Sequence, residues 1–83
     1  MRSITVTGVL VADQWEPDGN IADLALLTDD EDKYLIRPGD FGEDFKAVLR
    51  KKIKIRGVLT TKAQEKRIRV LDYRPVVPIK SWS

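Results

Sequence analysis

The chain has 83 residues, of which 42% are hydrophobic and 34% charged, with a net charge of +2. A chain of this length and composition is expected to form one small globular domain. Cysteine and histidine are both absent, which excludes disulfides, thiolate chemistry, catalytic triads built on histidine, and zinc sites made from these residue types. No apolar run approaches the roughly 20 residues of a membrane span, and no signal-peptide pattern is present. We therefore expect no membrane association and a cytoplasmic location.

The charges are distributed unevenly along the chain. Residues 1–45 carry eleven acidic and three basic side chains, a net charge of −8, whereas residues 46–83 carry twelve basic and two acidic ones, a net charge of +10. Such an asymmetry bears on partners and association rather than on the fold.

The first predicted element is a strand at "ITVTGVLV", Ile4 to Val11. Ile4 and Val6 alternate with threonines, and β-branched residues dominate. A second stretch, "IKIRGVLT" at 53–60, repeats isoleucine, glycine, valine and leucine at the same offsets. Gly8 and Gly57 predict a bulge or sharp bend in each strand.

The segment 20–28, "NIADLALLT", is ambiguous. Its apolar residues at 21, 24, 25 and 27 have helical spacing, but the segment is short and leads through "DDED" into the strand-like "KYLIR". A hairpin of two strands with an acidic turn explains both pieces, so we favour strand over helix for 21–27.

A helix of about three turns is predicted after Pro38-Gly39. Asp40 suits the N-cap, and Glu43 would complete a capping-box-like pair. The apolar stripe along this helix consists of Phe41, Phe45, Val48 and Leu49. We expect the two phenylalanines to close one end of the domain.

Two further strands follow, "KIKIRGVLT" and "KRIRVLDYR", joined by the polar loop "TKAQEK". Ile53 and Ile55 in the first, and Ile68 and Val70 in the second, are expected to face inward, with lysines and arginines between them facing outward. The tail 75–83 contains two prolines and is expected to be extended, with Trp82 either packed on the domain or free.

The order strand-strand-strand-helix-strand-strand resembles the OB-fold, an all-β barrel of five strands with one helix. The resemblance covers about residues 3–74, within a single domain at 1–74, and rests on the element order, the two strand glycines and the acidic hairpin. It implies that the first and fourth strands are neighbours. It also implies that oligonucleotides would bind across strands 2 and 3, flanked by the 1–2 and 4–5 loops. A mixed sheet of ubiquitin-like type is the alternative, but it would have only two strands before its helix.

The function that we expect is non-catalytic binding of single-stranded nucleic acid or another polyanion, because basic side chains gather on strands 4 and 5 and two aromatic residues could stack with bases. The candidate residues are Trp15, Tyr34, Lys52, Lys54, Arg56, Lys62, Lys66, Arg67 and Arg69. Three other interpretations stay open. The basic residues could be an ordinary solvated sheet face, acids and bases could pair across the surface, and Trp15 could be a lid on one end of the barrel.

The alternative function is a protein-interaction module or subunit that uses the acidic and basic halves. An enzyme is disfavoured, because the chain lacks histidine, cysteine and a glycine-rich phosphate loop. No cofactor is expected. "DDED" lacks the spacing of a calcium loop, so little or no cation binding is expected there.

Overall fold

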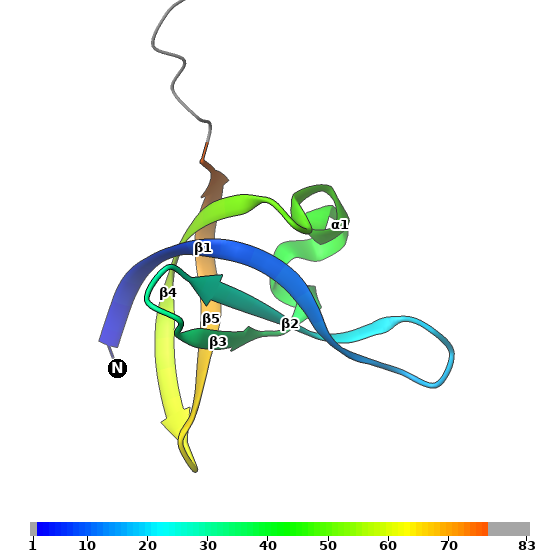
Figure 1. Ribbon diagram of the computed structural model, residues 1–83, viewed down its shortest axis with the longest axis horizontal. Helices are drawn as coiled ribbons and strands as arrows, with labels where there is room; N and C mark the ends of the chain where they lie inside the picture. The colour runs from blue at the N-terminus through cyan, green and yellow to red at the C-terminus, as the bar shows by residue number, and fades with distance from the viewer. Residues whose placement is uncertain (1, 77–83) are drawn as a thin grey trace, which may run out of the picture.

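The computed structural model describes residues 2–76, apart from the side chains of residues 43 and 44. It contains five strands, a 3₁₀ helix and one short α-helix (Figure 1). Their bounds are β1 Arg2–Trp15, β2 Ile21–Thr28, β3 Lys33–Ile36, the 3₁₀ helix η1 Pro38–Asp44, α1 Phe45–Val48, β4 Lys52–Lys62 and β5 Glu65–Pro75. The predicted tail overlaps the end of β5, and its residues 77–83, with Trp82, lie outside the described part.

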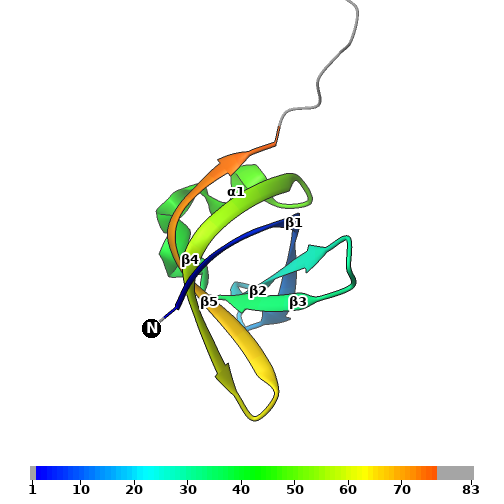
Figure 2. The same ribbon diagram turned by 90° about the vertical axis from the view of Figure 1, so that its left-hand side faces the viewer.

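The strands form a closed barrel in the order β1-β2-β3-β5-β4 (Figures 1 and 2). Residues 21–27 are strand, which confirms the hairpin interpretation over the helical one. All neighbours pair antiparallel except β3 and β5, which are parallel and share a single register pair, Leu35 opposite Arg67. This all-β barrel with its helical segment after the third strand confirms the predicted fold class, and it is compatible with an OB-like fold.

The two similar stretches lie side by side and run in opposite directions. Val6 of β1 is opposite Ile55 of β4, and each glycine faces the other stretch's first isoleucine: Ile4 is opposite Gly57, and Gly8 is opposite Ile53. The two stretches with the repeated sequence pattern therefore form one antiparallel pair of strands. This agrees with the resemblance, which implied that the first and fourth strands are neighbours.

The core fills the interior of this barrel. Ile53, Ile55 and Ile68 are almost fully buried as predicted, while Val70 packs against the core cluster. The fully buried side chains of this cluster come from all five strands, and they are Leu10, Leu24, Leu26, Ile36, Ile53, Ile55 and Ile68.

The helical segment differs from the prediction of three regular turns. It begins after Arg37 as a 3₁₀ helix, and Gly42 interrupts it with a φ of 65° before the four-residue α1. Asp40 is not the N-cap; its carboxylate instead accepts a hydrogen bond from the Val70 N–H of β5 at 3.0 Å. The side chain of Glu43 lies outside the described part.

The predicted apolar stripe still meets the barrel. Phe41 and Val48 belong to the core cluster, and Phe45 and Leu49 pack against it. Phe41 also contacts Tyr73 edge to face, with ring centroids 4.8 Å apart. The helical segment therefore covers one end of the barrel, in agreement with the expected role of the phenylalanines. Within residues 2–76, no helix is long and apolar enough to cross a membrane.

Candidate nucleic-acid interface

The outer face of β4 and β5 carries most of the predicted basic residues. Because Ile53 and Ile55 point into the barrel, the alternate residues Lys52, Lys54 and Arg56 point outward, and all three are exposed. The register places Thr7 of β1 and Arg74 of β5 on either side of Lys54. Thr5 and Asp72 lie on either side of Arg56 in the same way.

Lys54 and Arg74 are like charges directly opposite one another, an arrangement that destabilises an antiparallel sheet. Asp72 is the acidic side chain nearest to this pair in the register, but it already accepts two hydrogen bonds from the Arg56 guanidinium, at 2.9 and 2.6 Å. Within the described residues, neither Lys54 nor Arg74 forms an ion pair. This pair is therefore suited to an anion from outside the protein.

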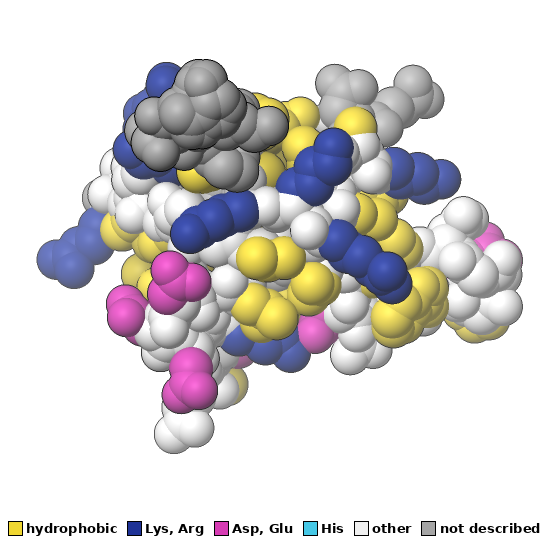
Figure 3. Space-filling view, turned by 45° about the horizontal axis from the view of Figure 1, so that its top comes forward, with side chains coloured by type: hydrophobic (Ala, Val, Ile, Leu, Met, Phe, Trp, Pro, Cys, Tyr) yellow, Lys and Arg dark blue, Asp and Glu magenta, His cyan; other side chains and the backbone are white. Residues whose placement is uncertain are grey.

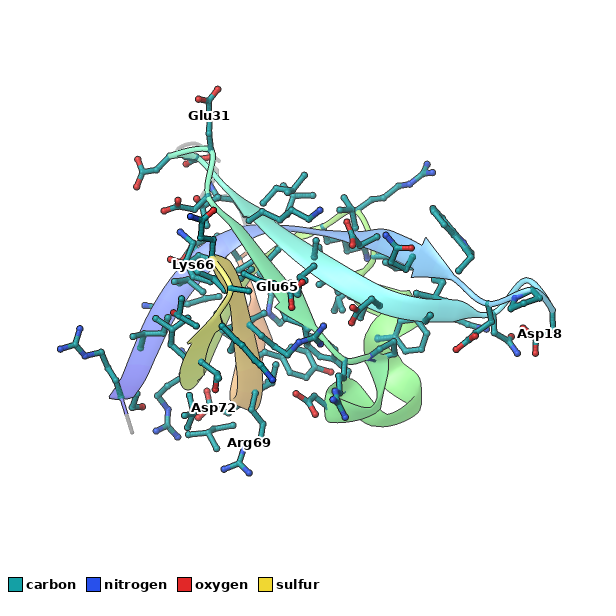
Figure 4. The ribbon with its side chains drawn as sticks, turned by 90° about the horizontal axis from the view of Figure 1, so that it is seen from below. Asp18, Glu31, Glu65, Lys66, Arg69 and Asp72 are labelled. Atoms are coloured by element: carbon teal, nitrogen blue, oxygen red, sulfur yellow. The ribbon has the colours of Figure 1, made fainter. Side chains whose placement is uncertain are left out.

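A shallow pocket of about 260 Å³ lies at this position. Its lining consists of Thr5, Lys54, Arg56, Asp72 and Arg74. The hydroxyl of Thr5 and the three cations can all donate hydrogen bonds to phosphate or carboxylate oxygens. Arg69 continues the basic surface along β5, on the same side of the molecule as Asp72 (Figure 4).

Two predicted residues, Lys66 and Arg67, contact acidic residues of the first half. The Lys66 ammonium lies 2.8 Å from the Asp32 carboxylate, and the Arg67 guanidinium donates two hydrogen bonds to Asp23, at 3.1 and 2.8 Å. The hydrogen bond to Asp32 raises the pKa of Lys66, and the bond to Asp23 raises the pKa of Arg67, in both cases against a smaller effect of burial. These two cations are engaged within the domain.

Other acidic and basic residues also pair across the surface. Lys33 contacts Asp13 at 2.6 Å, and Lys52 lies 3.8 Å from Asp29. The interpretation that acids and bases pair across the surface therefore holds for several residues. Lys54, Lys62 and Arg69 have no such partner among the described residues.

The two predicted stacking residues do not share this face. Tyr34 is partly buried against the core cluster, and the Lys66 ammonium lies 4.9 Å from the centroid of its ring. Trp15 is 61% exposed, but it lies at the far end of β1, beside the 1–2 loop. The structure thus brings Lys54 and Arg56 into one pocket and leaves both aromatic residues elsewhere. Arg69 lines another pocket, with Arg37 and Arg67.

The surface between the start of β1 and the 2–3 hairpin is acidic. A shallow pocket there is lined by Tyr34, threonines of β1 and the aspartates of the hairpin, Asp29, Asp30 and Asp32. Glu31 points outward at the tip of the same hairpin, on the side opposite Arg69 and Asp72 (Figure 4). The negative charge there would repel phosphate, so the outer β4–β5 face is the better candidate.

Sequence reasoning did not single out Arg74 and Thr5 for the site. Arg74 falls at the end of the last predicted strand, where the cross-strand partner depends on the register. A bulge between Arg56 and Gly57 shifts that register, and no pattern in the sequence specifies its size. Thr5 could have been found from the expected pairing of the first and fourth strands.

Among residues 2–76, no cluster of acidic side chains is arranged to hold a metal ion. Comparisons with protein-family models, with curated proteins and with solved structures found no match.

Proposed function

We propose that this protein is a non-catalytic binding module for single-stranded nucleic acid or another polyanion, which it holds on the outer face of β4 and β5. The observation that carries the proposal is the like-charged pair Lys54 and Arg74, left without an internal counter-charge beside the Thr5 hydroxyl. A row of cations on such a surface can neutralise several phosphates along one nucleic-acid backbone.

The spacing of the outward cations supports a polyanion rather than a single ion. Lys52, Lys54 and Arg56 are two residues apart along β4, which separates neighbours by about 6.7 Å. Lys54 has no internal partner among the described residues, whereas Lys52 lies near Asp29 and Arg56 bonds to Asp72, so a ligand phosphate would compete with these two carboxylates. Arg69 and Arg74 extend the surface onto the next strand. Because these contacts would be to backbone phosphates, we expect the protein to bind oligonucleotides with little or no sequence preference. An OB-like barrel that uses this face would differ from the strand 2–3 mode that the resemblance implied.

The test is fluorescence polarisation with labelled 12-mers of oligo-dT and oligo-rU at low and moderate salt. We expect binding that weakens with salt, with a log–log slope of about −0.7 for each phosphate contacted. Lys54→Glu should weaken affinity about tenfold, equivalent to about 1.4 kcal/mol, and should make the salt slope shallower.

Lys46→Glu is the matched control, because it makes the same charge change on α1, away from the β4–β5 face. It should leave affinity within about twofold, a shift well under 1 kcal/mol. Equal losses in the two variants, or no binding of either oligomer at low salt, would refute the proposal.

A further inference from the structure

A further depression lies at the other end of β1, between that strand and the turn after α1. Its volume is about 360 Å³, and its walls are mostly apolar. The lining residues are Val11, Ala12, Trp15, Ile21, Leu49 and Arg50. In Figure 3, hydrophobic side chains are exposed beside Lys and Arg side chains over the arch of β1. A large exposed indole beside an arginine is the composition typical of protein-binding hot spots.

The backbone of β1 is open along this groove. Leu10 is the last residue of that edge with partners: its N–H donates to the Lys51 carbonyl at 3.2 Å, and its C=O accepts from the Arg50 N–H at 2.6 Å. In an antiparallel strand, alternate residues direct their N–H and C=O groups to the same side. Ala12, the next alternate residue, therefore directs both groups toward the groove, directly before the shift in the β1–β2 register between Ala12 and Gln14. No described residue outside the strand ladders forms a backbone hydrogen bond with it. Such an edge can accept one more strand.

Arg50 forms the charged wall of the groove, and its backbone conformation is unfavourable for an arginine. Its φ is 65°, in the left-handed region that glycine adopts at the ends of helices with the least strain. Non-glycine residues held in this region cluster at functional sites. Arg50 forms no ion pair within the described residues, and Lys51 and Lys52 follow it directly. An arginine here supplies a positive group at the groove, which a glycine would not.

We infer that this groove binds an extended segment of a partner protein, which adds to the edge of β1 at Ala12. One apolar side chain of the segment packs on Trp15 and Leu49, and a neighbouring carboxylate pairs with Arg50. The Trp15 indole and the aliphatic side chains around it suit an apolar peptide side chain. The basic run at 50–52, in which Lys52 also lies 3.8 Å from Asp29, favours an acidic peptide. This site is separate from the polyanion-binding face, and it gives the alternative expectation of a protein partner a specific location.

The first experiment is a selection from a random octapeptide library on the intact protein, with counter-selection on Trp15→Ala. Since Trp15 is largely exposed, this variant should fold normally, which circular dichroism checks. We expect peptides in which Asp or Glu stands next to an apolar residue. Failure to obtain peptides that depend on Trp15, or enrichment of basic peptides, would overturn the inference. So would dimerisation that depends on Trp15, measured by light scattering.

The second experiment uses Arg50→Gly, whose two effects should have opposite signs. Glycine relieves the left-handed backbone, so the midpoint of urea unfolding should rise. Affinity for a selected acidic peptide should nevertheless fall at least tenfold, whereas a copy with glutamine in place of each acid should bind both proteins equally. If Arg50 were only structural, stability and affinity would change together, and that outcome would contradict the inference.

Two controls separate this site from the polyanion face and test the strand pairing. Lys54→Glu should leave peptide affinity unchanged while it weakens oligonucleotide binding, so either function can fail alone. N-methylation of alternate peptide amides should abolish binding in one register, and the Ala12 amide signal should shift on titration with the unmodified peptide. An Ala12 signal that stays in place at saturation would exclude the added strand.

Discussion

At the scale of single residues, Gly8 and Gly57 are set by close contacts between strands rather than by unusual dihedral angles. A Cβ on Gly8 would meet the backbone carbonyl of Leu27, and one on Gly57 would meet the Arg69 carbonyl and the Ile68 side chain at 2.6 Å. These contacts are shorter than real Cβ atoms tolerate, so strands on both sides would have to move.

We expect Gly57→Ala to destabilise the protein by about 1–3 kcal/mol, the usual effect of overpacking a core, as measured by urea unfolding. Gly39→Ala is the control, because a Cβ there would meet no atom within 4 Å beyond its own stretch of chain. It should be neutral or slightly stabilising, since alanine restricts the unfolded chain. If both variants lost the same stability, the contact argument would be wrong.

At the scale of elements, the turn between β4 and β5 is a two-residue hairpin with unfavourable residues. Ala63 and Gln64 both have positive φ, 52° and 68°, between the closing pair Lys62 and Glu65. A turn of this kind, type I′, favours Asn-Gly. The double substitution Ala63→Asn with Gln64→Gly should therefore stabilise the protein by about 1 kcal/mol or more.

Urea unfolding would measure this gain. The matched control is Thr61→Asn, which changes a strand residue next to the turn and should not stabilise the protein. A loss of stability in the double variant would mean that Ala63 or Gln64 makes a contact that outweighs the backbone strain.

The strands and the position of the helical segment were predictable from the sequence, but the irregular form of that segment was not. Strict alternation around Ile53 and Ile55 specifies which face is buried, because a shift by one residue would expose both. The apolar stripe of the helical segment is equally clear, but it does not specify the turn type. Gly42, which breaks the segment, stands inside the predicted helix, and glycine at that place was the available signal.

At the scale of the whole molecule, the candidate site was only partly predictable because charge pairing depends on tertiary structure. Lys66 and Arg67 look equivalent to Lys54 in the sequence, yet they contact Asp32 and Asp23, more than thirty residues away. Lys54 stays available because the register places Arg74, a second cation, opposite it. The net charge of +10 in residues 46–83 therefore overstates the basic surface that a ligand meets.

The ion pairs Lys66–Asp32 and Arg67–Asp23 lie near the contact between β3 and β5, which has the fewest paired residues of any two neighbouring strands in the barrel. Leu35 and Arg67 form the single register pair between these two strands. The ion pairs link β5 to β2 at Asp23 and to the turn before β3 at Asp32. Asp23 and Arg67 are both largely covered and share two hydrogen bonds. Asp23→Asn should therefore destabilise the protein by about 1 kcal/mol, a value reduced for partial exposure.

Hydrogen exchange can show where that loss occurs. Because β1 and β4 pair over eight residues, their amides should keep their protection relative to global unfolding in Asp23→Asn, whereas the amides of β3 should exchange faster through local opening. Asp72→Asn is the control, since its partner Arg56 lies on the long β4–β5 ladder, away from the β3–β5 contact. A uniform change across all strands in Asp23→Asn would mean that the barrel opens only as a unit, and that the ion pairs do not hold the β3–β5 contact separately.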